Sequence, residues 1–340
     1  MLAVRKLRAG DGRLERLEVP VPVPGHDEVV VRLEATGVDP TDIAIMRDEY
    51  RGKIPFRAPV TVGHEGVGVV VDAGAGARAA LGRRVALHAI LGEGECPSCR
   101  ARKPYLCPDW SHLGIQYDGT FASHVLQPLA ATTEIAEHVP AEAAAVMEPL
   151  AHAVHVADVL DLTAVSTAVL VGPGPVGLMQ MVRLRAAGVQ DWIVVGTERD
   201  EARLALAARL GARTVVGPVA ARAAVGELDG GADLVIEACG DGAVVGPALT
   251  WVRPEGQVAL LGFTSDASVM PMAIVRGDLR VVGAMAAGPA HYDRAARLLA
   301  DGVVDPRPLV DATAPIDRWS EVLDAVAGRT VTKAVLTFDA

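Results

Sequence analysis

The sequence has few aromatic residues, few cysteines and too few basic residues to balance its acidic ones. Phe, Trp and Tyr make up 4% of the 340 residues, whereas hydrophobic residues make up 51%. The core must therefore be packed mainly from small and branched aliphatic side chains. The formal net charge of −10 argues against a nucleic-acid partner, which would require a basic face.

Long apolar runs are also missing, because Glu, Arg or Pro interrupts every stretch that approaches the length of a membrane span. The first ten residues, MLAVRKLRAG, contain no apolar segment typical of secretory signals, so we expect a cytoplasmic protein without membrane contact. Of the four cysteines, three fall between Cys96 and Cys107, which favours a metal site over a disulfide. The fourth, Cys239, is expected to pack in the core.

A glycine-rich turn lies between a predicted strand and a predicted helix. The β-branched run Val169–Val171 is followed by GPGPVG, and an apolar-periodic segment then continues to Ala187. In such a motif the first glycine makes the turn, the second admits a pyrophosphate and the third lets helix pack on strand. The motif predicts dinucleotide binding, although a turn that binds no nucleotide would look similar. The predicted binding residues are Gly172, Gly174, Pro175, Val176 and Gly177.

Strands and helices alternate from Val169 onward, and a length of 340 residues favours two domains. Six predicted strands separated by helical segments indicate a doubly wound parallel sheet. They are Val169–Val171, Trp192–Val195, Thr214–Val216, Asp233–Glu237, Gln257–Leu261 and Arg280–Val282. Residues 1–130 are instead β-rich, and the pattern becomes helical from Glu142 to Leu160.

Three polar positions precede the glycine motif. They are Asp39 in TGVDPTD, His64 in VGHEGVG and Glu148 in MEPLAHAVHVA. Taken singly, each has an ordinary explanation as a turn residue, a core histidine or a helix-face charge. Their occurrence together ahead of a nucleotide-binding motif favours a functional site.

With these motifs in this order, the chain resembles the medium-chain dehydrogenase/reductase superfamily, in particular its zinc-dependent alcohol, polyol and threonine dehydrogenases. The resemblance covers essentially the whole length and includes PVTVGHEGVGVVVDAG, CPSCRARKPYLC, DGTFASHV and VLVGPGPVGLMQ. It implies an α/β fold with a GroES-like β-rich catalytic domain over 1–150, a Rossmann NAD(P)-binding domain over 151–285, and a return to the first domain over 286–340. A homodimer or homotetramer is usual in this superfamily.

The resemblance places a catalytic zinc ion where Asp39, His64 and Glu148 converge. The family usually has Cys at the position of Asp39, and a carboxylate binds zinc less selectively than a thiolate. A carboxylate at this position occurs in some sugar dehydrogenases of the family. A metal-free variant that kept the fold is the alternative.

Further roles follow from the same resemblance. Thr41 matches the hydroxyl that takes the proton from the alcohol, Asp42 the carboxylate that orients the ligating histidine, and Glu65 a residue that exchanges onto the metal in some members. Ala44 stands where alcohol dehydrogenases often carry a proton-relay histidine. The proton must therefore leave through the cofactor ribose, water or another side chain; His88 is a candidate, with a buried structural role as the alternative.

The cysteine loop only partly matches the family's four-cysteine structural zinc site. Cys96 and Cys99 fit, but the third position is Arg102, and Cys107 comes three residues before the fourth is expected. Three thiols with one further donor would still bind zinc, and a loop that lost its metal is the alternative. The candidate fourth donors are His112 and Asp109.

The choice between NAD and NADP depends on the end of the second Rossmann strand. An acidic residue there normally binds the ribose hydroxyls of NAD, but the sequence has Gly196 at this position. Glu198 would favour NAD by reaching the ribose, whereas Arg199 would favour NADP by pairing with a 2′-phosphate. The sequence leaves both open.

The expected function is zinc-dependent, NAD(P)-linked oxidation of a secondary alcohol in a polyol, sugar or amino alcohol to the ketone. A metal dication stabilises an alkoxide at neutral pH, and the nicotinamide then accepts the hydride. One alternative is a metal-free reductase of an activated C=C or C=O. The other is a non-catalytic nucleotide-binding protein, which would have no need of Thr41, Asp42 or Glu65 for packing.

Overall fold

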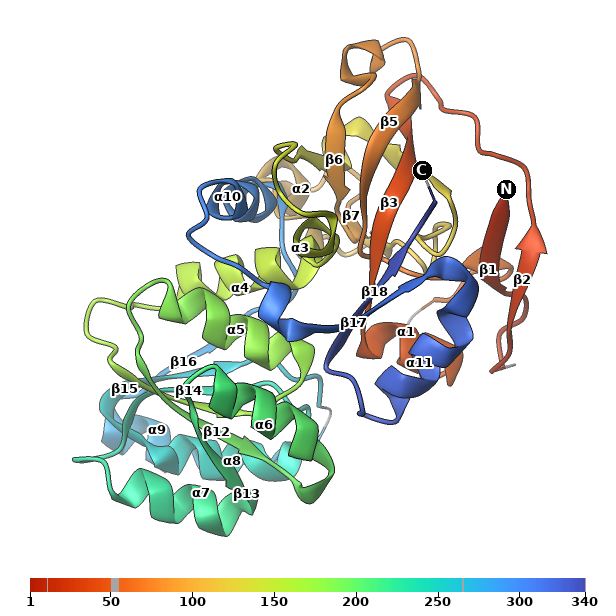
Figure 1. Ribbon diagram of the computed structural model, residues 1–340. Coiled ribbons are helices and arrows are strands. Elements are labelled where there is room, and N and C mark those ends of the chain that lie inside the picture. Colours follow the sequence, from red (N-terminus) through yellow and green to blue (C-terminus); the bar gives the residue numbers. More distant parts are fainter. Residues whose placement is uncertain (11, 50–54, 265, 340) are drawn as a thin grey trace. The chain divides into compact units, whose positions relative to one another are not determined.

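The computed structural model describes residues 1–10, 12–49, 55–264 and 266–339. Contacts divide the chain into two units, and Figure 1 labels many of their elements. Unit 1 comprises Met1–Ala151 with Ala286–Ala340, and unit 2 comprises His152–Met285. From the sequence we expect domain boundaries after residues 150 and 285. No helix among the described residues combines the length and apolar character of a membrane span.

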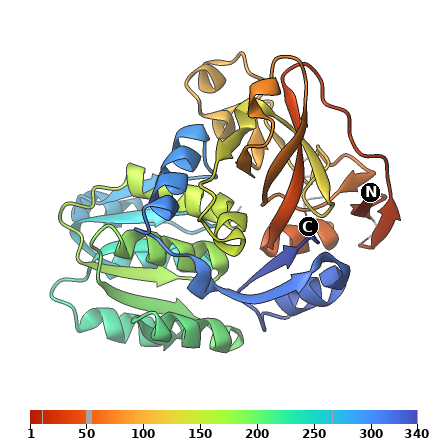
Figure 2. The same ribbon diagram turned by 45° about the horizontal axis from the view of Figure 1, so that its top comes forward.

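Unit 1 is built on a mainly antiparallel sheet around the long strand β3 (Glu28–Val38). β3 pairs with β5 (Val67–Ala73) and also with β18 (Lys333–Thr337), near the end of the chain. Figure 2 shows β18, in blue, beside the red-orange β3. The remaining strands of this sheet are β6 (Arg84–Leu87), β9 (His124–Pro128), β10 (Thr132–Glu134) and β17 (Val310–Pro315).

Two smaller sheets and several helices complete unit 1. One sheet contains β1 (Leu2–Lys6), β2 (Leu14–Glu18) and β4 (Val60–Thr61), and the other pairs β7 (Ile90–Leu91) with β8 (Ser111–His112). The helices are α1 (Pro40–Met46), α2 (Pro97–Arg100), α3 (Ala141–Ala145), α10 (Pro289–Ala300) and α11 (Trp319–Ala327). Apolar side chains of α1, α11 and β18 share one hydrophobic core, so the C-terminal segment of the chain completes the core of the N-terminal segment.

The segment expected to be helical, residues 142–160, is helical, but it forms two helices. α3 ends at Ala145, Val146 adopts φ −101° and ψ 29°, and α4 (Met147–Val159) follows. Pro149 has no N–H to donate to the carbonyl of Ala145, and its ring would clash with that carbonyl in a continuous helix. Pro149 instead occupies the first turn of α4, where no intrahelical donor is needed.

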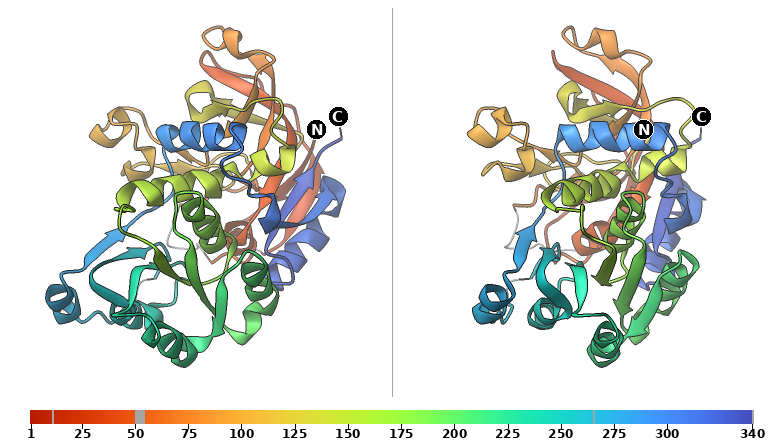
Figure 3. Two further views of the ribbon diagram at one scale, coloured as in Figure 1. Left: turned by 60° about the vertical axis from the view of Figure 1, so that its left-hand side comes forward. Right: turned by 90° about the vertical axis from the view of Figure 1, so that its left-hand side faces the viewer.

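Unit 2 is a six-stranded parallel sheet, which confirms the predicted doubly wound fold. Its strand order is β13-β12-β11-β14-β15-β16, and Figure 3 shows helices on both faces. The order reverses between β11 and β14, the place where such sheets bind ligands. The strands are β11 (Thr167–Val171), β12 (Asp191–Gly196), β13 (Arg213–Val216), β14 (Ala232–Glu237), β15 (Val252–Leu260) and β16 (Arg280–Gly283); the helices are α5 (Pro175–Arg185), α6 (Glu201–Arg209), α7 (Gly217–Gly226), α8 (Gly242–Trp251) and α9 (Pro271–Gly277).

One carboxylate joins the amino-terminal ends of the central strands of unit 2. Asp233 Oδ2 accepts hydrogen bonds from the backbone N–H groups of Ser166 and Thr167 at 2.9 and 2.8 Å, and Oδ1 accepts one from Arg253 Nε at 2.6 Å. Partial burial opposes ionisation of Asp233, but these bonds outweigh it and lower its pKa to about 2.

We therefore expect Asp233→Asn to destabilise unit 2 at neutral pH by about 1–3 kcal/mol, the range for a hydrogen bond to a charged group. The pKa of Asp233 is depressed in the folded state, so its contribution is complete above about pH 4 and is lost as the pH falls towards 2. Urea unfolding at several pH values should show a shallower acid dependence in the variant than in the wild type. Glu227→Gln removes the exposed ion pair with Arg213 and should change neither; equal acid dependence of wild type and Asp233→Asn would contradict the assignment.

Candidate functional site

The first candidate site is organised by the amino-terminal end of α1. Asp39 is the N-cap of this helix, and its Oδ1 accepts a hydrogen bond from the Thr41 N–H at 2.7 Å. Asp42 Oδ2 in turn accepts from the Asp39 N–H at 3.0 Å, which completes a capping box with Pro40 at the first helical position. The sequence DPTD thus fixes both carboxylates, while Asp39 Oδ2 is turned to the interior.

His64 lies between these two carboxylates. Its Nε2 is 3.6 Å from Asp39 Oδ2, and its Nδ1 is 3.4 Å from Asp42 Oδ1. Burial opposes protonation of His64, yet Asp39 and Asp42 together raise its pKa well above the usual value. Burial also opposes ionisation of Asp39, but His64, Lys333 and the Thr41 N–H lower the pKa of Asp39 overall.

Glu65 adds a third buried acid to the same place. Its Oε1 accepts a hydrogen bond from Lys333 Nζ at 2.5 Å, whereas Oε2 has no hydrogen-bond partner among the described residues. Gly37 makes room for this side chain, since a Cβ there would lie 2.0 Å from Glu65 Oε2. Burial raises the pKa of Glu65 to about 8 despite the opposing charge of Lys333.

The charges of the cluster suit a bound dication. Four carboxylates interact with His64, and Lys333 is the cation that faces them within the described structure. Oxygen and nitrogen atoms of Asp39, His64 and Glu65 lie within 4.8 Å of one another, as the ligands of one metal ion do. Without a cation, buried carboxylates of this kind recruit protons instead. The residues present therefore fit a metal ion such as Zn²⁺.

The other predicted residues lie around this group. Glu148 at the start of α4 is outside the set of donors within 4.8 Å but interacts electrostatically with His64 and Asp39, and burial raises its pKa. Thr41 and Ala44 are both half-buried on α1. His88 is fully buried against Tyr292, with ring centroids 4.0 Å apart, and its Nε2 is 2.9 Å from Thr133 Oγ1. These contacts favour the structural role over a proton relay.

The cysteine loop forms a second group of metal-ligating atoms. Cys96, Cys99 and Cys107 have ligand atoms within 4.8 Å of one another, together with a carboxylate oxygen of Glu93. Glu93 also accepts hydrogen bonds from the N–H groups of Glu95 and Cys96, which holds it in this loop. Burial and the neighbouring thiols raise the pKa of Cys99 to about 11. Three sulfurs and one carboxylate are a donor set that binds zinc.

His112, considered above as a fourth donor for this loop, lies elsewhere. Its ring centroid is 5.0 Å from that of His64. Burial and the proximity of His64 lower the pKa of His112 to about 3.

In unit 2, the three motif glycines have different surroundings. Gly172 has φ 98°, and a Cβ there would meet Cys239 at 2.8 Å; a Cβ on Gly177 would lie 2.2 Å from the Gly172 carbonyl oxygen. A Cβ on Gly174 would meet nothing within 4 Å, and no side chain caps α5, which begins at Pro175. The backbone beside Gly174 and the first N–H groups of α5 are therefore accessible to a phosphate.

Glu237 is the last residue of β14, and Cys239 follows it on the loop that faces this turn. The two carboxylate oxygens of Glu237 accept hydrogen bonds from the N–H groups of Cys239, Gly240 and Gly262, so one buried acid ties together the loops after β14 and β15. The expectation that Cys239 packs in the core is wrong, because its side chain is exposed. β14 ends at Glu237, which leaves Cys239 on a loop rather than on the buried strand.

The segment after β12 presents mixed charge to solvent. Thr197, Glu198 and Arg199 are exposed, whereas Asp200 is buried and accepts hydrogen bonds from the Thr197 N–H and hydroxyl at 3.0 and 2.7 Å. Asp200 is thereby turned back into its own loop. The strand therefore ends at a buried glycine, Gly196, and the nearby carboxylate of Asp200 is buried as well.

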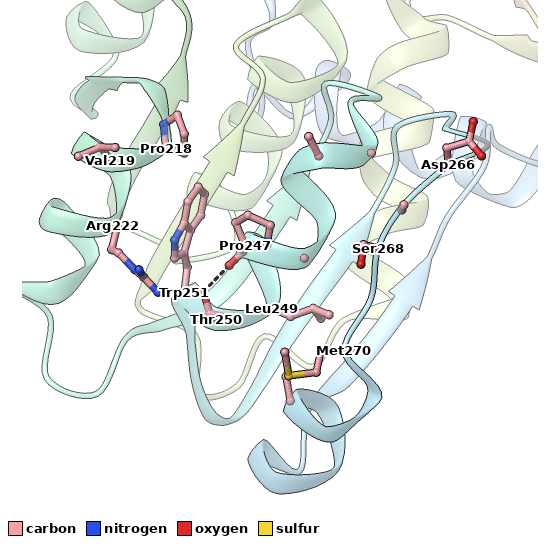
Figure 4. A pocket seen from close by; sticks show the side chains of 15 residues that line it. Pro218, Val219, Arg222, Pro247, Leu249, Thr250, Trp251, Asp266, Ser268 and Met270 are labelled. Atoms are coloured by element: carbon pink, nitrogen blue, oxygen red, sulfur yellow. Dashed lines mark hydrogen bonds between the residues drawn. The ribbon is translucent and has the colours of Figure 1, made fainter.

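Unit 2 also contains a groove of about 1160 Å³ between α7, α8 and α9 (Figure 4). Its lining includes Val219, Trp251 and Met270, and its charged side chains, Arg222 and Asp266, lie at opposite ends. Both groups of potential metal-ligating atoms found among the described residues lie in unit 1, outside this groove.

Lys333 and Glu93 were not anticipated from the sequence. Lys333 is a buried cation next to the apolar run Ala334–Leu336, and such a residue indicates an internal acidic partner. Glu93 precedes the first cysteine by three residues, and an acid so close to incomplete cysteine spacing is a usable signal for a mixed metal site.

Comparison with known proteins gives full-length matches. The model for the alcohol dehydrogenase GroES-like domain matches residues 25–137, and the model for the glucose dehydrogenase C-terminus matches residues 142–338. D-arabitol-phosphate dehydrogenase of Enterococcus avium is 31% identical over 96% of this chain and 94% of its own length. Sorbitol dehydrogenase of Halalkalibacterium halodurans is 31% identical over 99% of both chains. A Sinorhizobium meliloti structure described as a zinc-binding dehydrogenase bound to NADP is 31% identical, covers 99% and 98% of the two chains, and has a TM-score of 0.89.

If the cysteine loop binds a metal ion, Cys99→Ser should lower the metal content by one ion per chain and lower the melting temperature. Glu93→Gln should weaken retention of the same ion, because it removes the one carboxylate of the donor set. Mass spectrometry and elemental analysis of the purified proteins would measure both. Cys239→Ser is the matched control and should change neither value; identical metal content in the wild type and Cys99→Ser would show that the loop holds no metal.

Proposed function

Because the chain belongs to the medium-chain dehydrogenase/reductase superfamily and is an alcohol dehydrogenase of that superfamily, we propose that it oxidises a secondary alcohol of a small polyol or sugar to the ketone. It does so with zinc and a nicotinamide cofactor, and the reaction is reversible. The observation that supports the proposal is the buried cluster of Asp39, His64 and Glu65. A bound cation would stabilise the carboxylates of this cluster in their ionised form.

In the proposed site, some residues bind the metal ion and others orient the ligands or receive the proton. Asp39 and His64 would hold the metal ion, with Glu148 or Glu65 as a further ligand; bound zinc supplies Lewis-acid stabilisation of the alcohol oxygen, and the nicotinamide accepts the hydride. Asp42 orients His64 through Nδ1. The Thr41 hydroxyl receives the proton of the alcohol. Since Ala44 carries no relay group and His88 is bound to Thr133, the cofactor ribose or water carries the proton onward.

A polyol or sugar is favoured over a simple alcohol for two reasons. The relatives that match along the whole chain are named for sorbitol and arabitol phosphate, and the model that matches the second part is named for glucose dehydrogenase. In addition, some sugar dehydrogenases of the family have a carboxylate, as Asp39 is here, in place of the usual cysteine. The matches to threonine dehydrogenases, 31–32% identical over 72% of the chain, are shorter.

The metal role is tested by Asp39→Asn, which keeps a helix cap but removes the negative ligand. Incubated with sorbitol, arabitol, xylitol, glucose and threonine, the wild type should reduce NAD(P) with a polyol or sugar, lose this activity on chelation and regain it with zinc. Asp39→Asn should lower kcat/KM more than about 100-fold, beyond the effect usual for outer partners of a ligand.

Cys99→Ser serves as the control, since it leaves the Asp39 cluster intact. Activity that survives both chelation and Asp39→Asn would support the metal-free reductase instead. A zinc-loaded protein that turns over none of these substrates would exclude the proposed substrate class.

We further propose that NADP is the preferred cofactor. The strand end lacks the carboxylate that binds the ribose of NAD, because Gly196 occupies its position and Asp200 is engaged by Thr197. Arg199 is exposed beside it and would pair with a 2′-phosphate. The NADP-bound relative from S. meliloti is consistent with this choice.

Arg199→Ala should lower kcat/KM for NADP about 10- to 100-fold, the effect of losing a charge-assisted hydrogen bond, and leave the value for NAD nearly unchanged. Steady-state kinetics with each cofactor would measure the ratio. Glu198→Ala is the matched variant and should not reduce the use of NADP. A wild-type preference for NAD that Glu198→Ala abolishes would reverse the assignment.

A further inference from the structure

Glu237 ends a central strand of the parallel sheet in unit 2. Its register partners are Val171, the last residue of β11, and Leu260, the last residue of β15. The three strands therefore finish at the same edge of the sheet, and the glycine-rich turn begins directly after Val171. In sheets of this type, ligands bind beyond the carboxyl ends of the strands, where the strand order reverses. Glu237 is thus at the edge where a dinucleotide is expected.

The carboxylate of Glu237 holds together the two loops that leave this edge. Its Oε1 accepts hydrogen bonds from the N–H groups of Cys239 and Gly240, both at 2.7 Å, and its Oε2 accepts one from the Gly262 N–H at 3.1 Å. The side chain of Glu237 is fully buried. A buried carboxylate is costly unless hydrogen bonds satisfy it, and here backbone N–H groups of two loops do so.

The backbones of the two loops touch each other beside this carboxylate. A Cβ on Gly262 would lie 2.3 Å from the Gly240 nitrogen and 2.6 Å from Glu237 Oε2, so the two loops meet without a side chain between them. The loop after β14 also borders the glycine-rich turn, because a Cβ on Gly172 would lie 2.8 Å from the Cβ of Cys239. Glu237 therefore fixes backbone that adjoins the predicted phosphate-binding turn.

The two halves of the sheet divide a dinucleotide between them. β12 and β13 lie on one side of β11, and β14, β15 and β16 lie on the other. Each half of a doubly wound sheet binds one mononucleotide. The segment after β12, which contains Arg199, is the proposed site of the adenosine ribose. The loops that Glu237 holds consequently belong to the half that takes the nicotinamide mononucleotide.

Resting on the use of a nicotinamide cofactor, we propose that Glu237 is a positioning residue for the nicotinamide half of that cofactor. It acts through the backbone of Cys239, Gly240 and Gly262, which it fixes before the cofactor binds. Loops that are already ordered lose little conformational freedom on binding, so the affinity is higher than with mobile loops. Without the carboxylate, the loop after β15 would have to be ordered at the expense of binding free energy.

Glu237→Gln tests this role, because it changes one oxygen into a donor. The amide oxygen can keep the bonds from Cys239 and Gly240, whereas the amide nitrogen would face the Gly262 N–H and form no bond with it. We expect the Kd of NADPH or NADH, whichever the wild type binds more tightly, to rise about 10- to 100-fold, the effect of losing a hydrogen bond to a charged group. The Kd of the matching adenosine fragment, 2′,5′-ADP or ADP, should change by less than about threefold, because the fragment lacks the nicotinamide half. Calorimetric titration in the absence of an alcohol measures both values.

Gly262→Ala provides a second variant that keeps the carboxylate. Its methyl group would push apart the two loops that meet at Gly240. It should therefore weaken binding of the whole cofactor and spare the adenosine fragment, as Glu237→Gln does. Hydrogen–deuterium exchange over residues 261–264 should be faster than in the wild type in both variants.

Asp233→Asn is the matched control, because Asp233 also accepts hydrogen bonds from backbone N–H groups, but at the amino-terminal ends of the strands. It should destabilise unit 2 and leave both Kd values unchanged. Equal weakening of cofactor and fragment by Glu237→Gln, or an unchanged cofactor Kd in both loop variants, would overturn the positioning role.

The titrations also separate this inference from the proposed alcohol oxidation. A wild type that binds the cofactor but oxidises no alcohol would refute the proposed substrate class, while the comparison of Kd values would still decide the role of Glu237. A wild type that binds neither NADPH nor NADH would refute the inference itself.

Discussion

The structure depends most on the burial of excess negative charge around His64. Carboxylates in a low-dielectric interior are costly unless they are paired or bind a cation. Here one lysine, Lys333, serves several acids, and the pKa values of Glu65 and His64 rise as the protein recruits protons. A dication would satisfy the same charges without protons, and the cluster therefore fits the proposed metal site better than a structural ion pair.

The rest of unit 1 places the members of this cluster. The DPTD sequence caps α1 and aims Asp39 inward, Gly37 leaves room for Glu65, and β18 pairs with β3 so that Ala334 faces Val38. That register brings Lys333 to the end of β3 that leads into Asp39. The C-terminal segment is therefore part of the site as well as of the fold.

The parallel sheet of unit 2 could be predicted because each of its strands is marked by a local apolar run between helical segments, and its six strands appear where expected. The break at Val146 could have been predicted from Pro149. Lys333 and Glu93 could not be assigned partners, because their contacts depend on long-range register and on loop geometry that one sequence does not encode locally. His112 was considered for the wrong site for the same reason: its distance from Cys107 along the chain says nothing of the ring's contact with His64.

The central claim is that Asp39 and His64 bind a metal ion. X-ray diffraction at the zinc absorption edge, on crystals of the zinc-replete protein, tests it most directly. The account predicts an anomalous peak within about 2.0–2.2 Å of an Asp39 oxygen and of His64 Nε2. Zinc-replete crystals with a peak at the cysteine loop but none between Asp39 and His64 would contradict it.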